Sequence, residues 1–335
     1  MNGATTRGND QGMLTILVTP HGAVRPDQRA RLLDVHPEVK VIMVDTLDAM
    51  VARLPEADAI VTGFQVPDDQ FENATKLRWI HNMGAGVDRL LTGELMRLPH
   101  ITISASKGPM GHLMAEHALA LMLALARNLP GFQRNQSEKR WRYLMRENWH
   151  LTELGGKTIA ILGVGEVGGH LARMCGVGLN MRVIGMARAS RDVPHVDRYF
   201  DRGEMLSALG EADVVALSMP VTPSTVHIIN AEALAAMKPT AFLVNVARGK
   251  LIDEVALVEA LRTGQIAGAG LDVTDVEPLP DDSPLWDLPN AIVTPHASAV
   301  TDRLGDHFVD FWAENIRRFV DGRPLLGLVD REAGY

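Results

Sequence analysis

Three residues in the C-terminal part of the chain have side chains that could perform acid–base chemistry on an anionic substrate. They are Arg248 in NVARGKLID, Glu277 in LDVTDVEPLP and His296 in TPHASA. A fixed guanidinium can hold a carboxylate through two hydrogen bonds, and an imidazole can give a proton to an oxygen or take one from it. A nearby carboxylate favours the protonated imidazole. We therefore predict that Arg248, Glu277 and His296 are catalytic, the alternatives being a surface turn at Arg248 and a structural histidine at 296.

A glycine-rich turn upstream has the spacing of a dinucleotide-binding motif. It reads GVGEVG and contains Gly163, Gly165, Glu166, Val167 and Gly168. A β-rich run precedes it, a helical pattern follows, and a further β-rich run comes next, which is the context that such a turn needs. Glycine permits the tight turn and close approach to a pyrophosphate, and the helix N-terminus favours an anion. The alternative is a strand–helix turn that only requires glycine.

The segment after the next strand indicates which dinucleotide is preferred. Enzymes selective for NAD place an acidic residue there, on the ribose hydroxyls. This chain has Ala187 and Arg188, followed by Ser190 and Arg191. Two guanidiniums and a hydroxyl can bind a 2′-phosphate through charge-assisted hydrogen bonds. NADP(H) is therefore the preferred cofactor and NAD(H) is possible, unless the arginines are only solvated loop residues.

The pattern of the whole chain predicts an α/β protein with two doubly wound parallel sheets. Its 335 residues are enough for two domains. Short β-rich runs alternate with helical stretches, which implies parallel strands joined by helices. In the first half these runs are 14–18, 39–44, 57–63 and 77–83, with helices around 26–34, 46–53 and 67–74. In the second half they are 157–162, 181–187, 212–220, 240–247, 266–273 and 291–295, with helices at 203–210, 231–237 and 252–263.

The expected domain boundaries divide the chain unevenly. A flavodoxin-like substrate domain comprises 13–105 and 297–335, because the amphipathic helix predicted at 301–322 should fold back onto the first unit. The cofactor domain, of the Rossmann type, comprises 106–296. Residues 1–12 form a polar tail that we expect to be disordered. The apolar helix 110–127 and the helical stretch 130–143 are a buried linker or a subunit interface.

Composition excludes several classes of protein. A net charge of −8 argues against a nucleic-acid binder, and no run of apolar residues is long enough for a membrane span. The single cysteine, Cys175, cannot form an intrachain disulfide, which favours a cytoplasmic location. His112, Glu116 and His117 lack a third suitably spaced ligand, so no metal site is expected.

With these motifs in this order, the chain resembles members of the D-isomer-specific 2-hydroxyacid dehydrogenase family. The resemblance covers residues 57 to 322 in seven ordered blocks. They are HNMGAGVD (81–88), AEHALALML (115–123), LGGKTIAILGVGEVG (154–168), LSMPVTPST (217–225), NVARGKLIDE (245–254), AGAGLDVTDVEPLP (267–280) and PLWDLPNAIVTPH (284–296). The departure from NAD-type members is at Ala187 and Arg188.

The resemblance implies a role for each matching residue. Arg248 would bind the substrate carboxylate and keto oxygen, His296 would be the acid–base group, and Glu277 would pair with it. Backbone N–H groups of Gly84, Ala85, Gly86 and Val87 would also bind the carboxylate. Cofactor contacts would come from Met219, Pro220, Thr225, Val246, Ala247, Arg248, Asp272 and His296. The active site would lie in the cleft between the domains, and the helix at 110–127 would serve a homodimer.

We therefore predict an NAD(P)-dependent oxidoreductase that interconverts a small-molecule 2-oxo acid and a D-2-hydroxy acid. The expected direction is NADPH-dependent reduction. Two rival functions remain at this stage. One is oxidation of formate or phosphite, and the other is a dinucleotide-sensing, corepressor-like binding protein.

Overall fold

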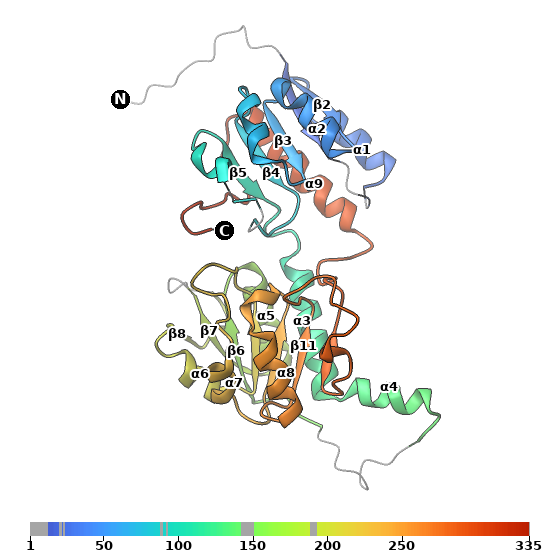
Figure 1. The fold of residues 1–335 in the computed structure, drawn as a ribbon, viewed down its shortest axis with the longest axis vertical. Coiled ribbons are helices and arrows are strands. Elements are labelled where there is room, and N and C mark those ends of the chain that lie inside the picture. Colours follow the sequence, from blue (N-terminus) through green and yellow to red (C-terminus); the bar gives the residue numbers. More distant parts are fainter. Residues whose placement is uncertain are drawn as a thin grey trace. The chain divides into compact units, whose positions relative to one another are not determined.

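The computed structural model describes residues 13–19, 22, 24–87, 90–91, 93–141, 151–187 and 193–334. The chain divides into two compact units. Unit 1 comprises Met1–Pro109 and Thr301–Tyr335, and unit 2 comprises Met110–Val300. Each is built on one parallel sheet with helices packed against it (Figure 1). The predicted α/β fold class is therefore confirmed, while the predicted tail at 1–12 lies outside the described residues.

The sheet of unit 1 has five parallel strands in the order β2-β1-β3-β4-β5. This is the flavodoxin-like order, in which the chain reverses direction across the sheet after β2. The strands are β1 (Leu14–Val18), β2 (Val39–Met43), β3 (Ala59–Thr62), β4 (Trp79–Asn82) and β5 (Thr102–Ala105). Their helices are α1 (Pro26–Leu33), α2 (Leu47–Arg53) and α9 (Leu304–Val320).

The C-terminal helix α9 completes the core of unit 1. Its residues Val309, Trp312 and Ile316 are fully buried and pack with Ile16 and Trp79 from the sheet. Figure 1 shows this helix, in red, beside strands drawn in blue and cyan. An amphipathic helix must bury its apolar face, and here that face covers strands formed roughly 230 to 300 residues earlier in the chain.

The sheet of unit 2 has seven parallel strands in the order β12-β11-β10-β9-β6-β7-β8. The strands are β6 (Thr158–Leu162), β7 (Arg182–Met186), β8 (Arg198–Phe200), β9 (Val214–Leu217), β10 (Phe242–Asn245), β11 (Gly268–Leu271) and β12 (Ala291–Val293). From β6 the chain builds outward through β7 and β8, then returns to the other side of β6 with β9. The loops after β6 and β9 therefore meet where open α/β sheets bind ligands.

Helices cover both faces of this sheet. They are α3 (Gly111–Ala126), α5 (Glu166–Arg173), α6 (Met205–Glu211), α7 (Ala231–Ala236) and α8 (Glu254–Thr263). Helix α4 (Leu129–Ser137) follows α3 and extends away from the sheet (Figure 1). Leu121 and Leu125 of α3 lie against Gly270 and Gly268 of β11, where an added Cβ would come within 2.9 and 3.1 Å of these leucines. Much of the apolar character of α3 is thus explained by packing inside unit 2.

Some predicted elements differ from the observed ones. The helical stretch at 67–74 is a 3-10 helix, Asp68–Asn73, and the stretch at 130–143 ends as a helix at Ser137. Strands β5 and β8 were not expected. The serines in β5 and after it, Ser104 and Ser106, are buried although polar, which hides the strand pattern. Strand β8 is a three-residue edge strand, too short for a period to show.

Candidate functional site

Arg248 stands at the carboxyl end of β10, in a turn that its neighbours hold rigidly. The buried Asn245 side chain accepts a hydrogen bond from Ala247 N at 3.0 Å and donates one to Arg248 O at 2.8 Å. Glycine is required next, because a Cβ on Gly249 would lie 1.9 Å from Thr274 O. The half-buried guanidinium donates to Ala247 O at 2.7 Å. The turn therefore fixes a cation at the carboxyl edge of the sheet.

His296 and Glu277 meet although 19 positions separate them. Nδ1 of His296 lies 2.9 Å from Oε2 of Glu277, and the side chains are 50% and 31% exposed. The other carboxylate oxygen, Oε1, accepts from Thr274 N at 3.3 Å. An ionised carboxylate only accepts hydrogen bonds, so Nδ1 of the ring carries the proton and Nε2 is the nitrogen left for proton exchange with a substrate.

Asp272 follows β11 and its carboxylate is fully buried. Oδ1 accepts from Thr294 Oγ1 at 2.6 Å and from Ala297 N at 2.9 Å, and Oδ2 accepts from Ser298 N at 2.9 Å. Burial alone would raise the pKa of Asp272, but the hydrogen bonds from Ser298, Thr294 and the backbone outweigh it and the pKa is lowered. A buried carboxylate thus remains ionised because donors surround it.

The glycine turn after β6 leaves room for a ligand at one position and none at two others. A Cβ on Gly163 would lie 2.6 Å from Met219 N, and a Cβ on Gly168 would lie 2.3 Å from Gly163 O. Gly163 also has a positive φ of 103°. By contrast, no atom lies within 4 Å of the Cβ position of Gly165, which caps α5. Glu166 and Val167 form the first turn of this helix.

The other predicted cofactor contacts surround the same edge. Ala187 follows β7 and packs partly buried against the core, while Arg188, Ser190 and Arg191 lie outside the described residues. Met219 and Pro220 follow β9, and Thr225 Oγ1 donates to Pro220 O at 2.9 Å. Val246 and Ala247 follow β10 and are buried. The predicted residues of unit 2 that the structure describes therefore lie after the carboxyl ends of β6, β7, β9, β10, β11 and β12.

The predicted substrate loop belongs to unit 1 and follows β4. Asn82 shapes it, because its amide donates to Gly84 O at 3.0 Å and to Gly86 O at 2.8 Å. With these two carbonyls tied back, the loop presents a compact turn. Gly84 and Ala85 are exposed, Gly86 is half-buried and Val87 is buried.

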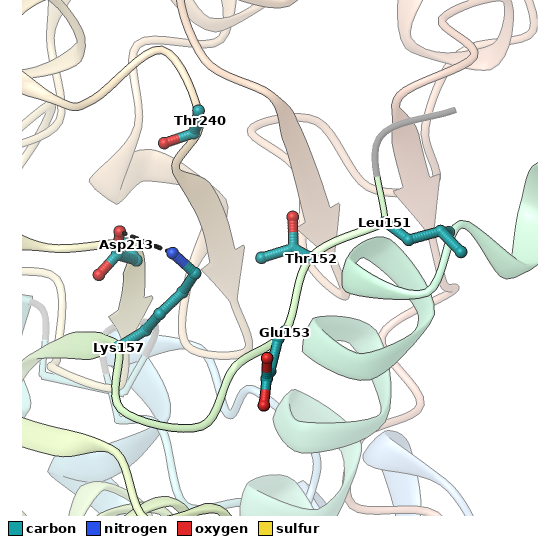
Figure 2. Close-up of a pocket in the computed structure, with 6 residues that line it drawn as sticks. All are labelled: Leu151, Thr152, Glu153, Lys157, Asp213 and Thr240. Carbon is teal, nitrogen blue, oxygen red and sulfur yellow. Dashed lines mark ion pairs between the residues drawn. The ribbon is translucent and has the colours of Figure 1, made fainter. Parts of the chain in front are cut away.

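A pocket of about 220 Å³ lies at the opposite, amino edge of the unit 2 sheet. Figure 2 shows Lys157 and Asp213 as an ion pair in its lining, where Lys157 Nζ lies 3.7 Å from Asp213 Oδ1. Asp213 also binds Lys238 at 3.1 Å and accepts from Thr158 N at 3.0 Å. Asp213 thus pairs with two lysines and ties the starts of β6 and β9 together, which is a structural role. Within the described part of the chain, no group of three His, Cys, Asp or Glu residues could hold a metal, and no helix could cross a bilayer.

Comparison with known proteins identifies the family. The family model described as D-isomer specific 2-hydroxyacid dehydrogenase, NAD binding domain, matches residues 119–298. Glyoxylate reductase from Pyrococcus furiosus is 36% identical over 291 residues, covering 85% of this chain and 86% of the relative. The chain belongs to the D-isomer-specific 2-hydroxyacid dehydrogenase family. It is therefore an NAD(P)-dependent oxidoreductase that acts between a 2-oxo acid and a D-2-hydroxy acid.

Solved structures of other family members have the same fold. A 2-hydroxyacid dehydrogenase from Xanthobacter autotrophicus Py2, in complex with NADPH and MES, is 32% identical with a TM-score of 0.82, covering 96% of this chain and 99% of that one. An NADPH-dependent glyoxylate/hydroxypyruvate reductase from Sinorhizobium meliloti, in complex with NADP and sulfate, is 29% identical with a TM-score of 0.81, covering 96% of this chain and all of that one.

The glycine turn of this dehydrogenase fits the dinucleotide that the family binds. The open space at Gly165 is a place that a side chain would fill and that a pyrophosphate can approach. Gly163 and Gly168 meet backbone atoms instead, so they allow the strand, the turn and α5 to pack closely. Gly165 and the N-terminus of α5 are the groups that would hold the phosphates.

Several residues that shape the site were not predicted from the sequence. Asn82 and Asn245 each hold a turn through side-chain amides, and Ser218 Oγ donates to Gly163 O at 2.7 Å. The sequence signal for the two asparagines is their place at the end of a buried strand, where a polar residue needs partners. His117 and Thr294 contact each other at 2.9 Å. No sequence signal pairs these two residues, because they lie on elements 177 positions apart.

Proposed function

We propose that this dehydrogenase reduces small 2-oxo acids, of the size of glyoxylate or hydroxypyruvate, to hydroxy acids with NADPH. The names of its relatives support this substrate class, since the relative from Pyrococcus furiosus is a glyoxylate reductase and the one from Sinorhizobium meliloti a glyoxylate/hydroxypyruvate reductase. When bound, NADPH supplies the hydride. The residues of this chain bind the acid, orient it and supply the proton.

The observation that carries the proposal is the contact between His296 and Glu277 at the carboxyl edge of the sheet. Glu277 holds Nδ1, at 2.9 Å, and thereby turns Nε2 toward the exposed side of the ring. A protonated His296 would donate from Nε2 to the keto oxygen as negative charge develops there. In the reverse direction the neutral ring would accept the hydroxyl proton at the same atom.

Arg248 would hold the other end of the substrate. Its guanidinium stays charged at every physiological pH and has two parallel N–H groups for a carboxylate. The same cation stabilises negative charge on the adjacent keto oxygen during reduction. We also propose that backbone N–H groups of Gly84–Val87 bind the substrate carboxylate. Asp272 is proposed to contact the cofactor.

The choice of NADPH over NADH rests on position 187. An aspartate or glutamate there would repel a 2′-phosphate, and this chain has Ala187. Arg188, Ser190 and Arg191 follow in the sequence and would supply positive charge and a hydroxyl. The structures of two family members with NADPH or NADP support the same preference.

The comparisons do not favour the two rival functions. The named relatives described above are reductases or dehydrogenases of 2-hydroxy acids. Steady-state assays would separate the alternatives. A panel of 2-oxo acids should be measured with NADPH and with NADH, and formate and phosphite should be measured with NADP⁺ and with NAD⁺. We expect turnover of short 2-oxo acids with NADPH. Cofactor binding without turnover of any 2-oxo acid would contradict the proposal and favour a sensor.

A homodimer and a cytoplasmic location complete the proposal. Leu129, the first residue of α4, and Trp141, which lies beyond the end of this helix, are 53% and 87% exposed. This region therefore offers large apolar side chains to a second copy. Sedimentation at micromolar concentration should give a dimer, and a monomer would contradict it. The single cysteine, Cys175, supports a reducing compartment.

A further inference from the structure

A hydrogen-bond chain joins helix α3 to the loop that carries His296. Nε2 of His117, on α3, lies 2.9 Å from Thr294 Oγ1 and 3.4 Å from Asp272 Oδ1. The imidazole is 24% exposed, and the Asp272 carboxylate that it faces is completely buried. His117 thus connects a helix at one side of the sheet with the residues next to the predicted acid–base group.

The direction of each hydrogen bond in this chain follows from counting protons. Thr294 Oγ1 lies 2.6 Å from Asp272 Oδ1. An ionised carboxylate only accepts, so the single hydroxyl proton of Thr294 points to Asp272. The hydroxyl oxygen must then accept from His117, whose Nε2 carries a proton. The hydrogen bonds therefore run in one direction, from His117 to Thr294 and from Thr294 to Asp272. This direction requires that the His117 ring be the Nε2–H tautomer or the imidazolium.

Asp272 uses its remaining capacity to hold the backbone on both sides of His296. Its carboxylate accepts from Ala297 N and Ser298 N, each at 2.9 Å, and its carbonyl accepts from His296 N at 2.8 Å. His296 itself has a positive φ of 52°, a conformation that is uncommon for residues other than glycine and that its surroundings must stabilise. The restraint is supplied by Asp272, whose partner Thr294 is oriented by His117.

We propose that His117 is a positioning residue for His296 and acts through Thr294 and Asp272. This inference rests on the proposed acid–base role of His296. Without a donor at position 117, the Thr294 hydroxyl loses the hydrogen bond from His117 and can rotate away from Asp272. The loop at 294–298 then samples other conformations, and Nδ1 of His296 spends less time against Glu277. Misplacement of a proton donor lowers kcat more than it weakens binding.

Two substitutions of His117 distinguish the effect of losing the N–H donor from the effect of changing the side chain's size. His117→Leu removes the donor, and His117→Gln keeps an N–H donor at a similar reach from the backbone. Glu116→Gln is the matched control, because it changes the neighbouring, exposed residue on the same helix. We expect His117→Leu to lower kcat for reduction by about tenfold to a hundredfold, with KM for NADPH unchanged. His117→Gln should regain most of the activity, and Glu116→Gln should keep all of it.

A second measurement does not depend on turnover. Amide hydrogen exchange on the ligand-free protein should show the N–H groups of Ala297 and Ser298 protected in the wild type and in His117→Gln, and exposed in His117→Leu. Nitrogen NMR of the His117 ring should show a proton on Nε2. Unchanged protection in His117→Leu, equal loss of kcat in both His117 variants, or an Nδ1–H tautomer would overturn the inference. If the wild type turned over no 2-oxo acid, the proposed function would fail, and the exchange and NMR results would still decide this inference.

Discussion

Nδ1 of His296 lies 2.9 Å from Oε2 of Glu277, and the opposite carboxylate oxygen accepts from Thr274 N. The carboxylate is thereby fixed at both oxygens, so it can hold the imidazole in one orientation and one tautomer. Such a pair can act in both directions of the reaction. The protonated ring is an acid for reduction, and the neutral ring is a base for oxidation.

Removal of the imidazole should damage turnover and leave cofactor binding intact. We expect His296→Ala to lower kcat for 2-oxo acid reduction by roughly 10²- to 10⁴-fold, the usual contribution of a positioned acid. The affinity for NADPH, measured by fluorescence titration, should stay near the wild-type value. Near-normal turnover in this variant would show that another group supplies the proton.

Removal of the charge on Glu277 should lower turnover and leave cofactor binding intact. The carboxylate accepts the Nδ1 proton of His296 and so fixes the orientation and the tautomer of the ring. Glu277→Gln keeps the shape of the side chain, but its amide can also present an N–H group to Nδ1, so the ring can take the other tautomer. We expect kcat for reduction to fall by about tenfold or more, with the affinity for NADPH unchanged. A wild-type kcat in this variant would exclude this role for Glu277.

Most strands of unit 2, and the strand ends that carry the candidate site residues, were predictable from local patterns. Every strand of unit 2 except β8 was predicted from the sequence. Arg248, Asp272 and His296 lie just after the observed ends of β10, β11 and β12. Because parallel strands end at one edge, the sequence alone indicated that these side chains share an edge. The contact between Glu277 and His296 was also predicted, but from family resemblance rather than from spacing.

The contacts made across packed elements were not predictable. The contact of His117 with Thr294 was not predicted, because nothing in a helix at 111–126 indicates which loop packs against it. Strand β5 was missed for a related reason. Ser104 and Ser106 are buried only because His81 and two tryptophans supply their hydrogen-bond partners, and those partners lie on β4 and α9. A period-2 pattern assigns such serines to the surface.

Cofactor preference should reverse when the acid missing at position 187 is restored. Ala187→Asp combined with replacement of Arg188 by serine adds repulsion toward a 2′-phosphate and removes a cation. We expect kcat/KM to be higher with NADPH in the wild type and higher with NADH in the double variant. The single substitution Arg188→Ser should give an intermediate ratio. Equal or better use of NADH by the wild type would contradict the assigned preference.

Two glycines of the turn should respond differently to the same substitution. Gly165→Ala places a methyl group in open space, so the fold should keep its stability while the affinity for NADPH falls. Gly168→Ala places it 2.3 Å from Gly163 O, which should lower the free energy of unfolding by about 1–3 kcal/mol as overpacking does. Thermal unfolding without cofactor and NADPH titration measure the two effects. Equal destabilisation by both substitutions would argue against a phosphate site at Gly165.

A buried histidine on β4, the strand that leads into the predicted substrate loop, should make stability depend on pH. His81 on β4 is 0% exposed, with Nδ1 2.7 Å from Ser104 Oγ and Nε2 3.0 Å from Ser106 Oγ. Trp79 and Trp312 donate to the same two hydroxyls, at 2.8 and 3.2 Å. Burial lowers the pKa of His81 from 6.5 to about 3. The neutral ring satisfies this network with one donor and one acceptor, so the folded chain resists protonation.

The consequence is a loss of stability in acid that begins near the unfolded pKa. Below about pH 6.5 the unfolded chain binds a proton at His81 and the folded chain does not, so the free energy of unfolding falls by up to about 1.4 kcal/mol per pH unit until the folded pKa is reached. Above about pH 6.5 the contribution of His81 to the free energy of unfolding is constant. Urea unfolding of the wild type and of His81→Gln, at about pH 7.5 and about pH 5, should show the stability advantage of the wild type shrinking at the lower pH. A difference between the two proteins that stays constant across this range would mean that His81 is protonated in the fold.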